Sequence, residues 1–85
     1  MEVEYTQGAK DDIAYWKSSR NFKIMQRITS IVLSIQATPF KGIGKPKPLK
    51  HRLTGLWSRR INKEHRIIYE VFDDYVLVHS LRGHY

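Results

Sequence analysis

Residues 41–66 are the part of this chain that most restricts its fold. This segment holds nine of the fifteen Lys and Arg residues but only one of the eight acidic residues, Glu64. Its glycines and prolines exclude a long helix, so the cations must lie on a loop and on the strands that follow. A surface with this density of positive charge faces either solvent or a polyanion. We expect the segment to form the floor of an RNA-binding site.

Hydrophobic periodicity predicts a short strand and two helices before this segment. Residues 2–5 alternate polar and apolar side chains, as a half-buried strand does. Thr6 can cap a first helix, because a threonine hydroxyl accepts a backbone N–H at such a position. The buried stripe of this helix is expected at Ala9, Ile13 and Trp16. A second helix is expected over residues 20–37, where apolar side chains recur at helical spacing until Pro39 stops it.

Residues 38–53 are expected to form a stiff loop, in which Pro46 and Pro48 hold Lys45 and Lys47 extended. Alternating side chains after this loop predict three strands and two turns. The strands are expected at residues 56–61, 65–72 and 75–81, with turns at 62–63 and 73–74.

This order of elements predicts an α+β fold in a single domain over residues 1–85. An N-terminal strand and a two-helix hairpin should pack on one face of an antiparallel sheet, leaving the other face for a ligand. The chain is too short to build a second core.

Composition narrows the class of partner. The net charge of +7 and the pI near 9.9 favour nucleic acid as the first candidate partner, an acidic protein as the second and an anionic membrane as the third. The absence of cysteine excludes disulfides and thiolate chemistry, which fits a cytoplasmic protein. No signal peptide or membrane-spanning run is expected. His51, His65 and His79 lack the carboxylate or cysteine neighbours of a defined metal site, so neither a metal nor another cofactor is expected.

Metal-independent cleavage of RNA needs three groups. One accepts the proton of the 2′-hydroxyl, one neutralises the charge on the phosphate, and one protonates the departing 5′-oxygen. Arg66, Arg60 and Lys50 suit the second role, and His84 suits the third because histidine titrates near neutrality. Glu64 is the only acid of the basic segment that could serve as the base. The other candidate phosphate-binding cations are Arg59 and Lys45.

The last residues, Gly83-His84-Tyr85, directly follow a strand rich in valine and leucine. The sheet can therefore fix the side chains of His84 and Tyr85 close to whatever the cations bind. The alternative is a frayed chain end, which is common at termini.

Three motifs carry a resemblance to a known family: GIGKPKPLKHRLTGLWSRRINKEHRIIYEV at residues 42–71, the terminal GHY, and DD-x-x-YW at residues 11–16. Over essentially its whole length the chain resembles the YoeB toxins of the RelE-like superfamily of bacterial toxin–antitoxin systems. The resemblance implies a RelE-like microbial ribonuclease fold. It also implies cleavage of mRNA in the ribosomal decoding site, with a 2′,3′-cyclic or 3′-phosphate product and a 5′-hydroxyl.

By position, Arg66 resembles the family's phosphate-stabilising arginine, His84 its general acid and Tyr85 its base-stacking or orienting tyrosine. The family's supporting cations correspond to Lys50 and Arg60. One position departs, since Lys47 stands where YoeB toxins typically carry a glutamate taken as the general base.

Four interpretations of Lys47 remain open. Lys47 could itself accept the proton if neighbouring cations and burial favour its neutral form. Glu64 could replace the missing base, or positioning and charge neutralisation on the ribosome could suffice for a slower reaction. Lys47 could also be an inactivating change. We expect a site that binds as its relatives do but cleaves more weakly.

The resemblance also implies partners. A YefM-like antitoxin should neutralise the toxin through an acidic segment that folds across the cations, and operator DNA should be bound only through the antitoxin complex. A homodimer is expected, with Trp57 and His79 as candidates for either its interface or the core. Two competing functions are a catalytically silent relative that binds ribosome or antitoxin, and a DNA-binding co-repressor.

Overall fold

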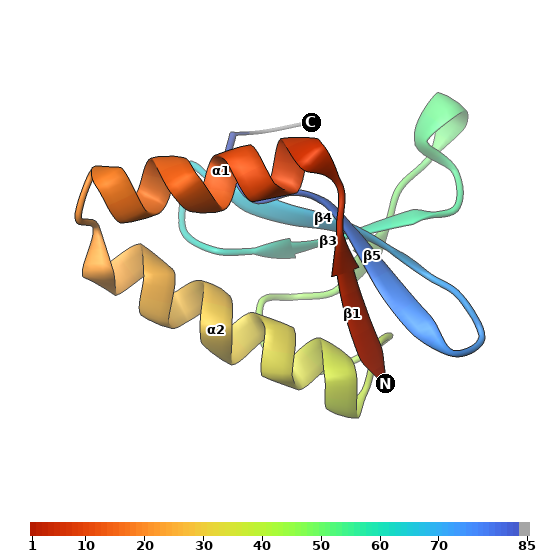
Figure 1. The fold of residues 1–85 in the computed structure, drawn as a ribbon. Helices are drawn as coiled ribbons and strands as arrows, with labels where there is room; N and C mark the ends of the chain where they lie inside the picture. Colours follow the sequence, from red (N-terminus) through yellow and green to blue (C-terminus); the bar gives the residue numbers. More distant parts are fainter. Residues whose placement is uncertain (84–85) are drawn as a thin grey trace.

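The computed structural model describes residues 1–83, in which two helices cover one face of a five-stranded sheet (Figure 1). The predicted α+β class, with its N-terminal strand and antiparallel helical hairpin, is confirmed. In chain order the elements are β1 (Glu2–Tyr5), α1 (Gln7–Ser18), α2 (Phe22–Ala37), β2 (Lys47–Pro48), the 3-10 turn η1 (His51–Leu53), β3 (Leu56–Arg60), β4 (Arg66–Val71) and β5 (Tyr75–Ser80).

The sheet has the strand order β1-β5-β4-β3-β2. Strands β3, β4 and β5 form the expected antiparallel meander. Strand β1 differs, because it pairs parallel with β5, with Val3 opposite Val76, and makes the sheet mixed. A parallel pair needs a long crossover connection, and the chain between β1 and β5 supplies one that includes both helices.

Side-chain caps set where the helices begin. The Thr6 hydroxyl accepts the Ala9 N–H at 3.1 Å, as the sequence predicts. Helix α2 begins at Phe22 rather than Arg20, so that boundary was predicted too early. Arg20 turns the chain with φ +57, and the Asn21 side chain then accepts the Ile24 N–H at 3.2 Å. A link of three residues therefore reverses the chain between the helices.

The core lies between the helices and one face of the sheet. Alternate strand residues face the helices, and each apolar side chain that is fully buried there contributes about 1.5–3 kcal/mol. The buried apolar side chains of this layer include Trp16, Ile31, Ile35, Ile67, Tyr69, Val76 and Val78. None of the helices in residues 1–83 is long and apolar enough to cross a membrane.

The loop before β3 is only partly as expected. Lys47 is extended and belongs to β2, but Lys45 has φ +53, so the prediction of an extended Lys45 was wrong. The reason is a close approach to β3, where the Gly44 carbonyl accepts the Arg60 N–H at 2.6 Å. The chain must turn sharply after this bond before Lys47 can pair with Ser58. The η1 turn projects away from the body of the molecule (Figure 1).

Candidate nucleic-acid interface

The strand register brings three of the predicted cations to one face of the sheet. Lys47 lies opposite Ser58, and Arg60 lies opposite Arg66. Ser58 and Arg60 are two residues apart on β3, so these side chains point to the same side, away from the helices. We call Lys47, Arg60 and Arg66 the basic face. Diagonal neighbours in such a sheet lie about 7–8 Å apart, a spacing that one nucleotide can bridge.

A short basic loop extends this face. Residues 47–53 line a hollow, and this loop includes the predicted ligand Lys50, which is exposed. Leu49 anchors the loop, because its side chain is buried and its N–H donates to the Leu56 carbonyl at 2.9 Å. Lys47 and Lys50, two residues before and one after this anchor, are both exposed. Lys45 is also exposed, at the left-handed turn described above.

Arg59 was predicted to bind phosphate, and that prediction was wrong. Its side chain is completely buried and faces the helices. Its guanidinium donates to the Ser34 hydroxyl at 2.7 Å and to the Tyr69 hydroxyl at 3.1 Å. Three backbone carbonyls accept its remaining hydrogen bonds: Thr38 at 2.7 Å, Lys41 at 2.9 Å and Ile43 at 3.2 Å.

The burial of Arg59 has a physical reason. Helix α2 ends at Ala37, so the carbonyl of its cap residue Thr38 lies at the negative end of the helix dipole and, like the loop carbonyls of Lys41 and Ile43, needs a donor. A planar guanidinium supplies five donors in one fork and can satisfy several such acceptors at once. Arg59 therefore closes the loop onto the end of α2 and has no donor left for RNA.

The general base candidates are both exposed. Lys47 is exposed on β2. Glu64 is exposed in the turn between β3 and β4, where its N–H donates to the Asn62 side chain at 2.8 Å. Between the cations, Ser58 is buried, and its hydroxyl has no hydrogen-bond partner within residues 1–83.

The chain end meets the strand that carries Arg66. The Arg66 N–H donates to the Gly83 carbonyl at 3.1 Å, so the residue before His84 is bonded to the backbone of β4. The predicted acid His84 and the predicted stacking residue Tyr85 lie outside the described residues. Residue 83 and the basic face are nevertheless joined directly.

Sequence reasoning missed the side chains that hold this chain end. Asp12 and Trp16 from α1 and His65 before β4 hydrogen-bond to Leu81 and Gly83. For Asp12 and Trp16 the signal in the sequence is the DD-x-x-YW motif, in which a carboxylate and an indole are four residues apart on one helix face.

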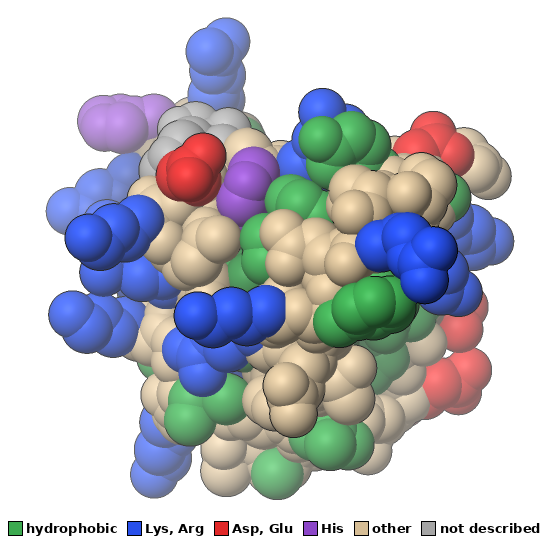
Figure 2. All heavy atoms as spheres, turned by 90° about the vertical axis from the view of Figure 1, so that its left-hand side faces the viewer, with side chains coloured by type: hydrophobic (Ala, Val, Ile, Leu, Met, Phe, Trp, Pro, Cys, Tyr) green, Lys and Arg blue, Asp and Glu red, His purple; other side chains and the backbone are tan. Residues whose placement is uncertain are grey.

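The charge of the sheet surface is divided between its edges. Register places Glu2 and Glu4 of β1 on the same side of the sheet as the basic face, at the opposite edge. Figure 2 looks onto the end of the molecule formed by the α1–α2 link and the β3–β4 turn, where Lys and Arg side chains are spread and acidic ones lie mainly at one margin. A polyanion is therefore favoured near β2, β3 and β4 and repelled at β1.

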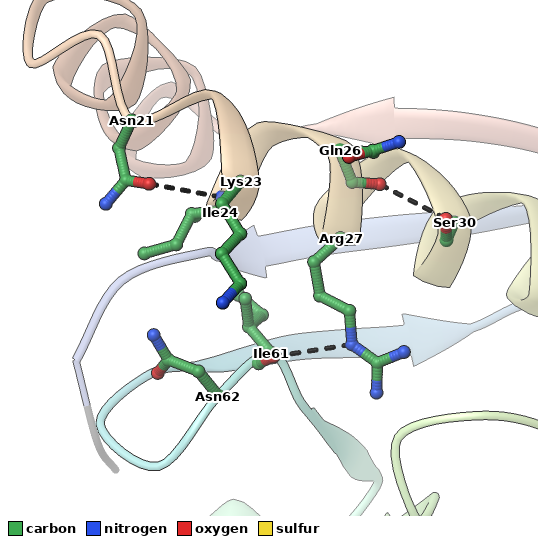
Figure 3. A pocket seen from close by; sticks show the side chains of 8 residues that line it. All are labelled: Asn21, Lys23, Ile24, Gln26, Arg27, Ser30, Ile61 and Asn62. Carbon is green, nitrogen blue, oxygen red and sulfur yellow. Dashed lines mark hydrogen bonds between the residues drawn. The ribbon is translucent and has the colours of Figure 1, made fainter.

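A separate hollow lies between the start of α2 and the end of β3 (Figure 3). Arg27 crosses it and donates to the Ile61 carbonyl at 3.4 Å, which ties α2 to the sheet. None of the predicted site residues lines this hollow. Within residues 1–83, His, Asp and Glu side chains form no group of three that could hold a metal.

A two-helix hairpin on a five-stranded sheet, with cations on the uncovered face, defines a small α+β domain suited to a polyanion. Residues 5–85 match the family described as YoeB-like toxin of bacterial type II toxin-antitoxin system. Toxin YoeB from Escherichia coli O6:H1 is 44% identical over 85 residues, which cover all of both chains. The chain belongs to this YoeB-like toxin family, which confirms the resemblance carried by its motifs.

Solved structures agree. The YoeB/ParE toxin from Agrobacterium tumefaciens has a TM-score of 0.95 at 36% identity, with all of both chains covered. Two YoeB structures from Staphylococcus aureus, a dimer and a heterotetrameric YoeB-YefM complex, have TM-scores of 0.90 and 0.89. Each is 36% identical, and the match covers all of this chain and 98% of theirs.

Proposed function

We propose that this chain is a ribosome-dependent mRNA endonuclease that inhibits translation as the toxin of a type II toxin–antitoxin pair. The observation that supports this most directly is the hydrogen bond from the Arg66 N–H to the Gly83 carbonyl. It joins the strand of the phosphate-binding candidate to the residue that precedes the candidate acid. The reaction is attack of the 2′-hydroxyl on the adjacent phosphate, without a metal.

The basic face supplies charge neutralisation. Arg60 and Arg66 lie directly opposite each other on β3 and β4. A phosphate oxygen is a strong acceptor for guanidinium donors, so the pair suits a polyanion, and Lys47 and Lys50 extend the contact. The negative charge that builds on the phosphate is stabilised in the same way.

Proton transfer is assigned to the chain end and to the β2 loop. His84 donates a proton to the departing 5′-oxygen, and Tyr85 stacks on or orients a base. No carboxylate occupies position 47, where the exposed Lys47 stands instead. We therefore assign slow cleavage, with Glu64, the one acid of residues 41–66, as the candidate base and positioning on the ribosome supplying the rest.

Primer extension on mRNA in a translating extract tests this function. Purified protein should cause new 5′ ends at codons in the decoding site, and His84→Gln should abolish these ends while ribosome binding persists. A message that stalls but stays intact would identify a silent relative that acts by occupancy. Intact message together with operator binding that appears only when the antitoxin is present would instead point to a DNA-binding co-repressor.

Restoring the acid tests the assignment of position 47. Lys47→Glu should raise the cleavage rate by about 100-fold, the lower end of what general bases contribute. Lys47→Gln is the matched control, because it removes the cation without supplying a base. Equal rates in both variants would show that a carboxylate at this position plays no part.

Partners follow from the family. The Staphylococcus aureus YoeB-YefM complex supports a YefM-like antitoxin for this chain, and the Staphylococcus aureus dimer supports a homodimer. An acidic antitoxin segment lying across the basic face would block RNA. We propose that operator DNA is bound only through that complex, and that the toxin acts in the cytoplasm, where ribosomes translate.

A further inference from the structure

Side chains that take no direct part in the proposed chemistry hold both backbone polar groups of Leu81. Its N–H donates to the Asp12 carboxylate at 2.9 Å, and its carbonyl accepts the Trp16 indole N–H at 3.0 Å. Leu81 and Trp16 are buried, so these bonds form where water does not compete. Two side chains of helix α1 thus fix the backbone directly after β5 through hydrogen bonds.

Gly83 is held in the same way from the other side. Its N–H donates to His65 Nδ1 at 2.8 Å, and its carbonyl accepts the Arg66 N–H at 3.1 Å. The His65 ring stands edge-on to the Trp16 ring, with centroids 4.8 Å apart and an interplanar angle of 79°. Each contact supports the next, because Trp16 is fixed by Leu81 and in turn orients His65.

From this geometry we propose that Asp12, Trp16 and His65, together the tail clamp, are positioning residues for the C-terminal catalytic residues. The inference rests on the proposed function, in which His84 is the general acid. Terminal residues are usually mobile unless their backbone is tied down. The tail clamp ties it down up to the peptide bond that leads to residue 84, and that bond is planar and rigid.

The expected effect is on turnover. A catalytic group gains much of its effect from being held in place, and a displacement of about 1 Å can cost about 100-fold in rate. Substrate affinity depends mainly on the cations of the basic face, none of which belongs to the clamp. Loss of the clamp should therefore lower kcat far more than it raises KM.

His65 offers a matched pair of variants. In His65→Asn the side-chain oxygen is the same number of bonds from Cα as Nδ1 and can accept the Gly83 N–H. His65→Leu has the same branch at Cγ but no acceptor. Both variants lose the ring contact with Trp16, so a difference between them reports the hydrogen bond alone.

Two measurements on the full chain decide the matter. Hydrogen exchange of the Gly83 amide, followed by NMR, should be at least about 10-fold faster in His65→Leu than in wild type, with His65→Asn near wild type. In steady-state cleavage on translating ribosomes, His65→Leu should lower kcat by about 10- to 100-fold with KM changed less than about threefold. His65→Asn should restore most of kcat.

The outcomes separate the two proposals. If His65→Leu cleaves mRNA as fast as wild type does, the tail clamp is overturned and the proposed function stays intact. Equal loss in the Asn and Leu variants would assign the effect to packing and would likewise overturn the clamp. Wild-type protein that binds ribosomes without cutting mRNA would overturn the proposed function, and with it the catalytic role of the clamp.

Discussion

Arg59 and Arg60 are adjacent in sequence but lie on opposite faces of β3, and this contrast allows a sharp test. We expect Arg59→Met to unfold at a much lower temperature than wild type, and Arg60→Met to keep its stability but bind RNA less tightly. Methionine preserves most of the aliphatic volume of arginine and removes only the guanidinium. The two variants are therefore controls for each other.

The size of the Arg59 effect follows from its contacts. Its guanidinium makes five hydrogen bonds, three of them to backbone carbonyls. A buried acceptor left without a donor costs about 1–3 kcal/mol. The Thr38 and Lys41 carbonyls each keep one other donor, and removal of a buried charge recovers part of its desolvation cost. We expect a net loss of about 3 kcal/mol in the free energy of unfolding.

That loss is large for a domain of this size. A chain of this length has a total stability of about 4–13 kcal/mol, and about 3 kcal/mol lowers Tm by roughly 12–24 °C. Arg60→Met should stay within about 0.5 kcal/mol of wild type, as exposed substitutions usually do. It should also reduce the slope of log affinity against log salt by about 0.7, the value for one phosphate contact on a single strand.

The assays are thermal unfolding followed by tryptophan fluorescence, and RNA oligonucleotide binding at several salt concentrations. The reasoning would be refuted if Arg59→Met unfolded like wild type while losing RNA affinity. That result would return Arg59 to the binding surface. A stability loss of several kcal/mol in Arg60→Met would equally contradict the assigned faces.

Two further predictions concern the same loop and core. Gly42→Ala should destabilise the protein by clearly more than Gly55→Ala in urea unfolding, although both glycines have positive φ. An added Cβ at Gly42 would clash with the Ser34 hydroxyl and approach Arg59, whereas an added Cβ at Gly55 would meet no atom of residues 1–83 within 4 Å. Equal losses in the two variants would contradict this packing. Burial raises the pKa of Tyr69, partly opposed by its hydrogen bond and charge interaction with Arg59. The native state therefore holds this proton more tightly than the unfolded state, so its contribution to stability is complete below about pH 10 and is lost as pH rises through the native pKa. Unfolding of Tyr69→Phe across this range should depend less on pH than wild type, and an unchanged slope would remove Tyr69 from the alkaline transition.

Much of the fold was predictable because its signals are local. Thr6 lies at the helix cap it was assigned, Pro39 follows the end of α2, and the alternating residues of β4 and β5 form strands. Each depends on neighbours within a few residues, where propensity and side-chain spacing decide the outcome. The family motifs were local too, and they identified the family correctly.

The site was predictable in its chemistry but not in its arrangement. Residue types alone indicated a basic surface, and the structure does place Lys47, Arg60 and Arg66 on one face. The face that each arginine takes depends on strand register, and a shift of one residue reverses it. Two consecutive arginines carry no local signal of which one is buried, so Arg59 was misassigned.

The residues that hold the chain end are separated by tens of positions. Asp12 lies 69 residues from Leu81 along the chain, and Trp16 lies 65 residues from it. His65 lies 18 residues from Gly83. Local patterns gave this protein its helices, its strands and the charge of its β2 loop. Only the packing of α1 against the end of β5 decided that Asp12 and Trp16 would hydrogen-bond to the backbone of Leu81. Hydrogen bonds between residues so distant in sequence form only once the core has brought them together.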